Sequence, residues 1–370
     1  MRVEIVDPSA FTPPYDHALS AALARAGAEV ELVTSRFLYG PVPREDGYRV
    51  TEAFYRRTAK RGLRAPARRA FKLAEHLPDM RRYRRLARKA DLVHYQWLTV
   101  PRLDRMLLPP ARPRVMTLHY PVPADPGRRQ SGHLRRLIES MDATVVHSRH
   151  ALGRLEAGYG VDPGRLELIH HGAFDYLTRL PEERPLPDEL AAVRGPVVLA
   201  FGLVRPYKGT ELLIEAFGKL SGAELWVVGM PRISLDPLRE QAAGVPGTVR
   251  FVDRFIPDPE IPAYMRRADL VVLPYLEVEQ SGVLYTALAF GKPIVLSAVG
   301  GFPEVAEQGA ARLVPPGDPA ALAETLGELL DSPAERQRLA EGARAAAAGP
   351  YSWDRIGERT LALYRRLLGR

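Results

Sequence analysis

Short apolar runs recur along the chain, and a turn and a helical pattern follow most of them. Such a run is typical of a strand buried on both faces, and an intervening helix lets successive strands pair in parallel. The alternation begins with strands over residues 2–6 and 30–34, around a helix over residues 18–26. Ten further strands are expected over residues 92–95, 115–119, 144–147, 166–169, 197–201, 224–228, 249–252, 270–273, 293–296 and 311–314.

This alternation predicts an α/β fold with two doubly wound parallel sheets, because 370 residues are too many for one ordinary core. Residues 173–195 are rich in proline and charge, which is typical of a linker between domains. We therefore expect Rossmann-like domains over residues 1–172 and 196–349, facing each other across a cleft. The last helix, within residues 350–370, is expected to pack back on the first domain.

The loop over residues 8–16 follows the first strand and contains Tyr15 and Asp16. Loops that follow parallel strands lie at the ligand-binding edge of the sheet, so we expect both side chains there. The loop has no G-x-G-x-x-G pattern, and a dinucleotide fingerprint is therefore missing.

Cysteine is absent, which excludes disulfides, thiolate metal sites and a cysteine nucleophile. The first residues run directly into a strand pattern, and no apolar run approaches the roughly 18 residues that cross a bilayer. We therefore expect a cytoplasmic protein that is neither secreted nor membrane-spanning.

The net charge is +8, and fourteen Lys or Arg residues fall between residues 56 and 89, against only Glu75 and Asp79. A solvated helical face is one interpretation of this run. Attraction to an anionic membrane surface or a lipid-linked acceptor is a second, because each Lys or Arg near such a surface contributes about 1 kcal/mol. Aromatic residues among the cations would allow stacking on bases, but no nucleic-acid module pattern accompanies them, and nucleic acid is not the expected partner.

Residues 202–209 form a glycine-bounded loop between the strand at 197–201 and a helix that starts near Thr210. The loop carries Arg205 and Lys208. Two cations beside a helix N-terminus suit a diphosphate, whereas an ordinary turn with two solvated cations is the alternative. The order Lys-Gly-Thr differs from the G-K-[ST] of a Walker loop.

Several histidines fall at or just after the ends of predicted strands, and a buried, hydrogen-bonded histidine is the common explanation for each. His119 differs because Tyr120 and Pro121 turn the chain away directly after it, which leaves its ring at a carboxyl end. No acidic or cysteine partner accompanies the closely spaced histidines, so a metal site is not expected. These histidines are His94, His119, His147, His150, His170 and His171.

Five segments, in this order and spacing, resemble the retaining nucleotide-sugar glycosyltransferases of the GT-B fold. That large group includes bacterial mannosyl-, glucosyl- and galactosyltransferases, and the resemblance covers nearly the whole chain. The segments are AFGLVRPYKGTELLIEAF, VRFVDRFIPDPEIPAYMRRADLVVLPY, QSGVLYTALAFGKPIVLSAVGGFPEV, LVPPGDPAALAETL and YSWDRIGERTLALY.

The resemblance implies that the second domain binds a UDP- or GDP-sugar. It implies metal-independent transfer of a hexose, with retention, to a hydroxyl of a glycan, a lipid-linked saccharide or a small metabolite, and no cofactor. The implied catalytic residues are His119, Arg205 and Lys208, and Tyr15 and Asp16 lie on the acceptor side. The implied donor-binding residues are Gly202, Gly229, Arg254, Phe255, Glu279, Gln280, Ser281, Gly282, Val283 and Thr286.

The chain departs from the family pattern at the two glutamates that usually contact the donor, where it has Val278 and Thr286. Glu279 and Gln280 adjoin the first position, and Leu203 replaces the usual arginine of the glycine loop. A subgroup with Q-S-G in place of the first glutamate is one interpretation. A non-catalytic binding protein of the same fold is an alternative, and a sugar-nucleotide epimerase is another.

Overall fold

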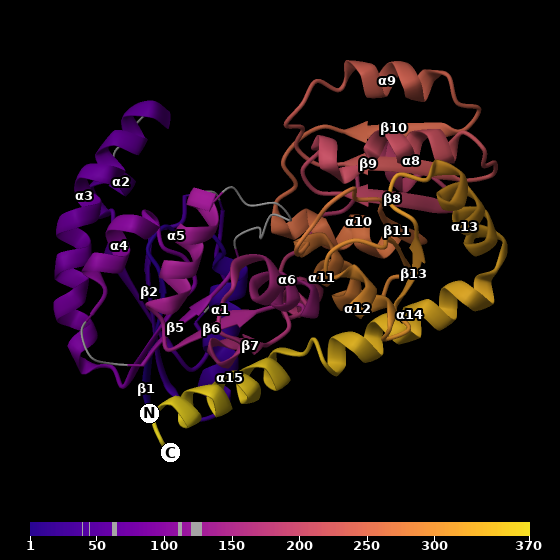
Figure 1. Cartoon of the computed structure of the whole chain (residues 1–370). Helices are drawn as coiled ribbons and strands as arrows, with labels where there is room; N and C mark the ends of the chain where they lie inside the picture. Colours follow the sequence, from indigo (N-terminus) through magenta and orange to yellow (C-terminus); the bar gives the residue numbers. More distant parts are fainter. Residues whose placement is uncertain (39, 44, 61–64, 110–112, 120–127) are drawn as a thin grey trace. The chain divides into compact units, whose positions relative to one another are not determined.

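The computed structural model describes all residues of the chain except 39, 44, 61–64, 110–112 and 120–127. The described residues form two compact units. Unit 1 comprises Met1–His171 and Trp353–Arg370, and unit 2 comprises Gly172–Ser352. Each unit holds a parallel sheet covered by helices, so the predicted α/β fold class is confirmed (Figure 1).

The sheet of unit 1 has seven strands in the order β3-β2-β1-β4-β5-β6-β7, and every pair of neighbours is parallel. The order reverses direction between β1 and β4, and ligands of such sheets bind at the carboxyl ends beside this point. The strands are β1 (Arg2–Asp7), β2 (Glu29–Ser35), β3 (Arg49–Phe54), β4 (Leu92–Tyr95), β5 (Arg114–Thr117), β6 (Ala143–Val146) and β7 (Leu166–Leu168).

Helices cover both faces of this sheet because alternate strand residues point to opposite sides. Ile5 packs with Leu19 of α1 and Ile356 of α15 on one face, whereas Val6 packs with Met80 of α3 on the other. Helix α15, yellow in Figure 1, thus completes the core of unit 1. The helices are α1 (Pro13–Arg25), α2 (Arg56–Lys60), α3 (Ala65–Leu86), α4 (Pro101–Leu107), α5 (Arg128–Glu139), α6 (Arg149–Tyr159) and α15 (Trp353–Leu367), with 3-10 turns η1 (Ala87–Lys89) and η2 (Pro163–Arg165).

The sheet of unit 2 has six parallel strands in the order β10-β9-β8-β11-β12-β13. Its order reverses between β8 and β11. The strands are β8 (Val197–Phe201), β9 (Glu224–Val228), β10 (Thr248–Val252), β11 (Leu270–Leu273), β12 (Ile294–Ser297) and β13 (Ala311–Val314).

Val198 packs with Leu213 of α8 and Leu326 of α13 on one face of this sheet, and Leu199 packs with Leu284 of α11 on the other. Residues 173–195, expected as a linker, lie within unit 2, where Leu190 is buried in the core. The helices are α7 (Asp188–Ala191), α8 (Thr210–Phe217), α9 (Asp236–Ala243), α10 (Ile261–Arg267), α11 (Gly282–Ala289), α12 (Phe302–Ala306), α13 (Pro319–Asp331) and α14 (Pro333–Ala348), with 3-10 turns η3 (Asp175–Arg179), η4 (Pro206–Lys208) and η5 (Asp258–Glu260).

One sequence-based expectation about unit 1 is wrong, and one strand was missed. Helix α1 begins at Pro13 rather than at residue 18, so Tyr15 and Asp16 lie in its first turn and not in a loop. Proline suits this position, because the first turn of a helix does not use its N–H groups. Strand β3 was not predicted at all.

In the described residues, no helix combines the length and the apolar character that a bilayer crossing requires.

Candidate functional site

The loop between β8 and α8 lies at the point where the strand order of unit 2 reverses. Gly202 directly follows β8 and has a φ of 96°, and Gly209 precedes α8 with a φ of 65°. A small pocket opens between this loop and the end of β11, and Gly202, Lys208 and Tyr275 are among its lining residues. The predicted phosphate loop therefore borders a pocket at the edge where α/β sheets bind ligands.

Two glycines that follow strands lie so close to neighbouring backbone that neither position tolerates a side chain. A Cβ on Gly229, which follows β9, would lie 2.0 Å from the carbonyl oxygen of Gly202. Likewise, a Cβ on Gly300, which follows β12, would lie 1.9 Å from the carbonyl oxygen of Val278. Glycine is therefore required at both positions.

The ammonium of Lys208 lies between Gly202 and the Tyr275 ring. Its Nζ lies 4.9 Å from the centre of the Tyr275 ring and 3.3 Å from the Cβ position of Gly202. No carboxylate among the described residues forms an ion pair with it. Burial, and then the nearby charge of Arg205, together lower the pKa of Lys208 to about 8. An anion placed here would relieve both effects.

Arg205 lies on the exposed side of the same loop. Within the part of the chain that the structure describes, its guanidinium makes no hydrogen bond or ion pair. Lys208 and Arg205 therefore place two neighbouring positive charges at one loop without a protein counter-charge. A diphosphate has the charge and the length to contact both.

The N-terminus of α11 adjoins Lys208. A Cβ on Gly202 would lie 3.0 Å from Val283 Cγ2, so the first turn of α11 packs against the loop. Ser281 caps this helix without a side-chain cap bond, and its hydroxyl lies 3.4 Å from the Tyr275 hydroxyl. The first backbone N–H groups of α11, from Gly282 onward, carry the partial positive charge of a helix N-terminus.

The remaining predicted donor-side residues differ in what they contact. Thr286 is buried, and its hydroxyl donates to the carbonyl oxygen of Gly282 at 2.9 Å. Arg254 is paired with Glu260, whereas the Phe255 ring is 53% exposed. Gln280 accepts a hydrogen bond from the Tyr285 hydroxyl, and Glu279 is largely buried beside it.

In unit 1, strand ends bring His119 next to Gln96 and Trp97. The Nε2 of His119 donates to Gln96 Oε1 at 3.0 Å, and its ring stacks on Trp97 with the centroids 5.3 Å apart. Burial, and then the charges of His147 and His171, lower the pKa of His119 well below its usual value. The ring is therefore neutral, with its Nε2–H fixed by Gln96 and its lone pair on Nδ1. Tyr120 and Pro121, expected to turn the chain away, lie outside the described residues.

Further histidines surround His119. His147 lies 5.2 Å from it by ring centroid, and its Nδ1 donates to the carbonyl oxygen of Ile169 at 2.8 Å. The Nε2 of His147 is buried without a hydrogen bond in the described residues. In that part of the chain, no group of three His, Cys, Asp or Glu side chains is placed to hold a metal ion. His94 is buried and bonds to Thr117 and Tyr364.

Tyr15 and Asp16, expected on the acceptor side, are 2% and 1% exposed. The ring of Tyr15 lies edge-on to His119, with centroids 4.8 Å apart, so Tyr15 positions that histidine. Burial and the nearby Asp7 carboxyl raise the pKa of Asp16 well above its usual value. Both side chains contact the protein interior, and neither faces solvent.

Two family models match the chain. The model described as Glycosyl transferases group 1 matches residues 195–332, and Glycosyltransferase Family 4 matches residues 15–173. Together they cover most of both units. The chain belongs to the GT-B glycosyltransferase family.

Among curated proteins, the D-inositol 3-phosphate glycosyltransferase of Salinispora arenicola is 34% identical over 251 residues. That match covers 62% of this chain and 56% of the relative. The chain thus matches little more than half the length of this curated relative.

Two solved structures show the same fold over almost their whole lengths. Sucrose-phosphate synthase of Thermosynechococcus elongatus superposes with a TM-score of 0.72 at 21% identity, covering 100% of this chain and 99% of that one. Anabaena HepE, in complex with UDP-glucose, superposes with a TM-score of 0.70 at 19% identity, covering 98% and 99%.

Several side chains of the candidate site were not predicted from the sequence. Tyr275 directly follows the Pro274 that ends β11, and Gln96 and Trp97 directly follow β4. The rule that ligands bind at strand carboxyl ends, applied to every strand beside the reversal point, would have identified them.

Proposed function

We propose that the chain transfers a hexose from a UDP- or GDP-sugar to an acceptor hydroxyl and retains the anomeric configuration. The observation that carries this proposal is the convergence of the Lys208 ammonium and the N-terminus of α11 on Gly202. The family of the chain and the UDP-glucose bound to the similar fold of HepE support the same donor class.

In the proposed reaction, Lys208, Arg205 and the first N–H groups of α11 hold the donor diphosphate. The bond between the anomeric carbon and the diphosphate oxygen breaks, and the acceptor oxygen bonds to the same face of that carbon. The acceptor proton passes to the leaving diphosphate oxygen. Negative charge grows on the diphosphate as its bond breaks, so fixed cations stabilise the transition state more than the ground state. No metal or cofactor takes part in this scheme.

Unit 1 supplies the acceptor side in this proposal. His119 is kept neutral by burial, its Nε2–H donates to Gln96, and its ring stacks on Trp97 at the carboxyl ends of β4 and β5. A neutral imidazole can accept a hydrogen bond from a sugar hydroxyl at Nδ1. Tyr15 and Asp16 act as positioning residues behind it.

A panel of UDP, GDP, ADP and dTDP with their common sugar conjugates, without metal, tests the donor assignment by thermal shift. A ligand at a hundred times its Kd adds about 2.7 kcal/mol of stability to the folded protein. We expect a clear shift with UDP or GDP and their sugars, and an NMR spectrum of the product should show the anomeric configuration retained. If no nucleotide shifts the transition, the chain is a non-catalytic member of its family.

A further inference from the structure

A second cavity lies within unit 1, at the carboxyl ends of β1, β2 and β3. Its volume is about 520 Å³. Small-molecule sites usually have volumes of roughly 300–1,000 Å³. The first turns of α1 form one wall of the cavity, and the segment that follows β2 forms another. His119 follows β5, which lies two strands away from β1 in the sheet, and it does not line this cavity.

Two buried polar side chains, which form the floor of the cavity, have unused hydrogen-bonding groups. Ser35 ends β2 and is 6% exposed, and its hydroxyl makes no hydrogen bond with any residue that the structure describes. His17 of α1 is 5% exposed, and its Nδ1 lies 2.6 Å from the Tyr48 hydroxyl. The Nε2 of His17 has no hydrogen-bond partner in the same part of the chain. Buried polar groups normally have partners, so a ligand with hydroxyl groups suits this floor.

The rim of the cavity is negative, although the chain as a whole carries a net charge of +8. Glu45 and Glu52 form this rim, and both are exposed. Neither pairs with a cation among the described residues, and none of the described residues that line the cavity is Lys or Arg. Asp16 also lines the cavity, but its raised pKa keeps that carboxyl largely neutral.

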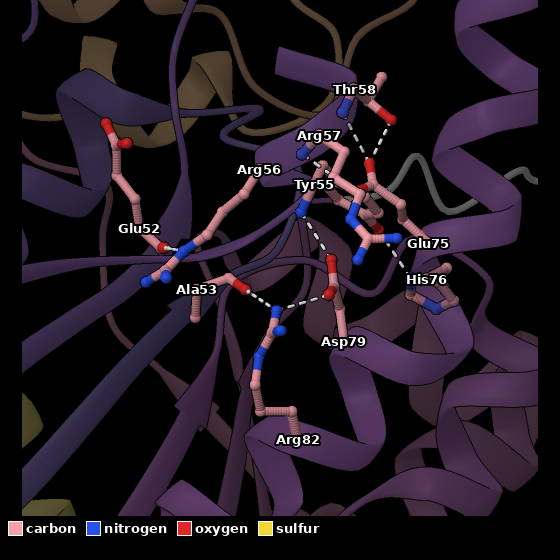
Figure 2. A network of polar contacts seen from close by, with 10 residues as sticks. All are labelled: Glu52, Ala53, Tyr55, Arg56, Arg57, Thr58, Glu75, His76, Asp79 and Arg82. Atoms are coloured by element: carbon pink, nitrogen blue, oxygen red, sulfur yellow. Dashed lines mark hydrogen bonds and ion pairs between the residues drawn. The ribbon is translucent and has the colours of Figure 1, made fainter. Parts of the chain in front are cut away.

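Both glutamates are available to a ligand. Figure 2 shows the Glu52 side chain extending away from the guanidinium of Arg56, whose Nε donates to the backbone carbonyl of Glu52 instead. Glu45 acts toward the floor, because its charge raises the pKa of Tyr48, after the larger effect of burial. Since the Tyr48 hydroxyl contacts His17, the negative potential extends from the rim to the floor. A cation placed between them would be stabilised.

Apolar side chains complete the walls between rim and floor. Leu32 of β2 is buried, and Phe37 and Val50 are partly buried. Such walls favour the C–H groups of an organic molecule over a hydrated inorganic ion. The cavity therefore combines apolar walls, two groups that can bind hydroxyls and a negative rim.

We propose that this cavity binds a compact organic cation that carries hydroxyl groups, such as an amino sugar. Its ammonium would lie between Glu45 and Glu52, and its hydroxyl groups would bond to Ser35 and His17. A phosphate would meet carboxylates and no described cation, so the cavity should reject it. This inference goes beyond the proposed function, because the cavity shares no residue with the donor loop and binding requires no sugar transfer.

The small number of histidines makes a site-specific titration practical, because the chain has nine. Imidazole ¹⁵N spectra of the full chain, labelled at histidine, give separate ring signals, and single His→Gln variants assign them. With glucosamine at pH 6 and constant ionic strength, we expect a saturable shift of the His17 signal. The signal of His150, which follows β6 on the far side of β4, should not shift. A His17 signal that stays still, or moves only together with that of His150, overturns the proposal.

Three further probes test the sign of the charge that the cavity selects. Glucose lacks the amine, N-acetylglucosamine has an uncharged nitrogen, and glucose 6-phosphate carries the opposite charge. At pH 6 both glutamates are ionised, because the ordinary pKa of glutamate is about 4.3. We expect the His17 signal to half-saturate with glucosamine at a concentration about fivefold lower than with either neutral sugar. Glucose 6-phosphate should bind most weakly, and equal binding of glucosamine and glucose would contradict a site for cations.

Removing the rim charges provides an independent measurement. Glu45→Gln with Glu52→Gln should weaken glucosamine binding about fivefold and leave glucose binding unchanged. The charge-matched pair Glu182→Gln with Glu240→Gln, at exposed positions of unit 2, should bind glucosamine as the unmodified chain does. Equal losses in both pairs would show general charge attraction and contradict the site.

Ser35→Ala separates a binding role from a structural one. The Ser35 hydroxyl has no hydrogen bond to lose in the described residues, so the unfolding midpoint should not fall. Binding of glucosamine should weaken about two- to tenfold, as for the loss of one hydrogen bond. Normal glucosamine binding by this variant would contradict the floor contact. A UDP titration of the same samples reports the donor site separately, so a failure of the proposed function is distinguishable from a failure at this cavity.

Discussion

The ammonium of Lys208 lies 4.9 Å from the centre of the Tyr275 ring, and in the described residues no carboxylate pairs with it. If this charge binds the donor diphosphate, Lys208→Met should weaken UDP binding by about 1.5–3 kcal/mol, as expected for a hydrogen bond to a charged group. Calorimetric titration measures this change. Lys219→Met, at an exposed position of the same unit, is the control and should leave the affinity unchanged.

The combined change Arg205→Ala with Lys208→Ala should abolish sugar transfer while the fold stays intact. Both loop cations are then gone, and the growing charge on the diphosphate has lost its fixed partners. Turnover measured with saturating donor, alongside the thermal unfolding midpoint, tests this expectation. Near-normal turnover of the double variant would remove the donor site from this loop.

UDP affinity should depend on pH in a range where an ordinary lysine side chain stays protonated. The pKa of Lys208 is lowered to about 8, so the ammonium that binds the diphosphate loses its proton as the pH rises through that value. We expect the affinity to fall above about pH 8, and Lys208→Arg to remove the fall because arginine stays charged. An unchanged affinity up to pH 10 in the unmodified protein would contradict this assignment.

The same pKa has the opposite effect on the stability of the ligand-free protein. Between about 8 and the ordinary value of 10.5, the unfolded state binds a proton at Lys208 that the folded state does not. The free energy of unfolding contributed by this group therefore rises with pH across that window. Comparing unfolding midpoints of the unmodified protein and Lys208→Met over this range isolates the contribution.

His119→Ala should reduce kcat by roughly 10²-fold, because a group that orients the reacting sugar is lost. UDP affinity should not change, since the proposed nucleotide contacts all lie in unit 2. Gln96→Leu removes the bond to His119 Nε2 and should reduce kcat less. If Gln96 acts only through His119, the double variant will be no slower than His119→Ala. Additive losses would show that Gln96 contacts the substrate itself.

Gly229→Ala should destabilise unit 2 by more than about 2 kcal/mol, because the added methyl group would meet the carbonyl oxygen of Gly202 at 2.0 Å. Gly229 also has a φ of 143°, which alanine rarely adopts. Gly153→Ala in α6 is the control, since a Cβ there meets nothing within 4 Å. Thermal unfolding should show a clear loss in the first variant and none in the second.

The basic region between residues 56 and 89 should give salt-sensitive binding to anionic liposomes. In α3, Arg81, Arg84 and Arg85 are exposed, as are the apolar side chains of Phe71 and Leu73. Arg61 and Arg64 of this region lie outside the described residues. We expect co-sedimentation with phosphatidylglycerol vesicles that declines as salt increases.

Arg84→Gln with Arg85→Gln should weaken this co-sedimentation more than the charge-matched pair Arg194→Gln with Arg232→Gln in unit 2. Binding that is equal at low and high salt would rule out an electrostatic membrane contact.

The sequence predicted those helices and strands whose residue pattern reflects how each is buried. Strand β8, its glycine-bounded loop and the start of α8 at Thr210 agree with the structure, because a strand buried on both faces must be continuously apolar. Strand β3, with the sequence RVTEAF, lies at the edge of its sheet, and its first four residues are exposed or only partly buried. It carries no such run and was missed.

Contacts between segments that are distant in the chain could not be predicted, because they leave no local pattern in the sequence. Lys72 was one cation among fourteen in the basic region, and its contacts with Phe11 and Tyr55 depend on how α3 packs beside β1 and β3. His119 was singled out for its place at a strand end, but its neutral state depends on burial and on His147, and its orientation on Gln96, which come from other strands. The local sequence therefore predicts the helices and strands, whereas the side-chain contacts of the candidate site depend on how the strands assemble.

Helix α15 has a consequence for the order in which the protein matures. Trp353, Ile356 and Tyr364 of this helix are buried in the core of unit 1, yet the ribosome makes them after all of unit 2. The first half of the chain therefore leaves the ribosome with one face of its sheet covered by α1 but not by α15. Unit 2 can therefore complete its hydrophobic core first. Unit 1 keeps an exposed apolar surface until α15 has been synthesised and packs against it.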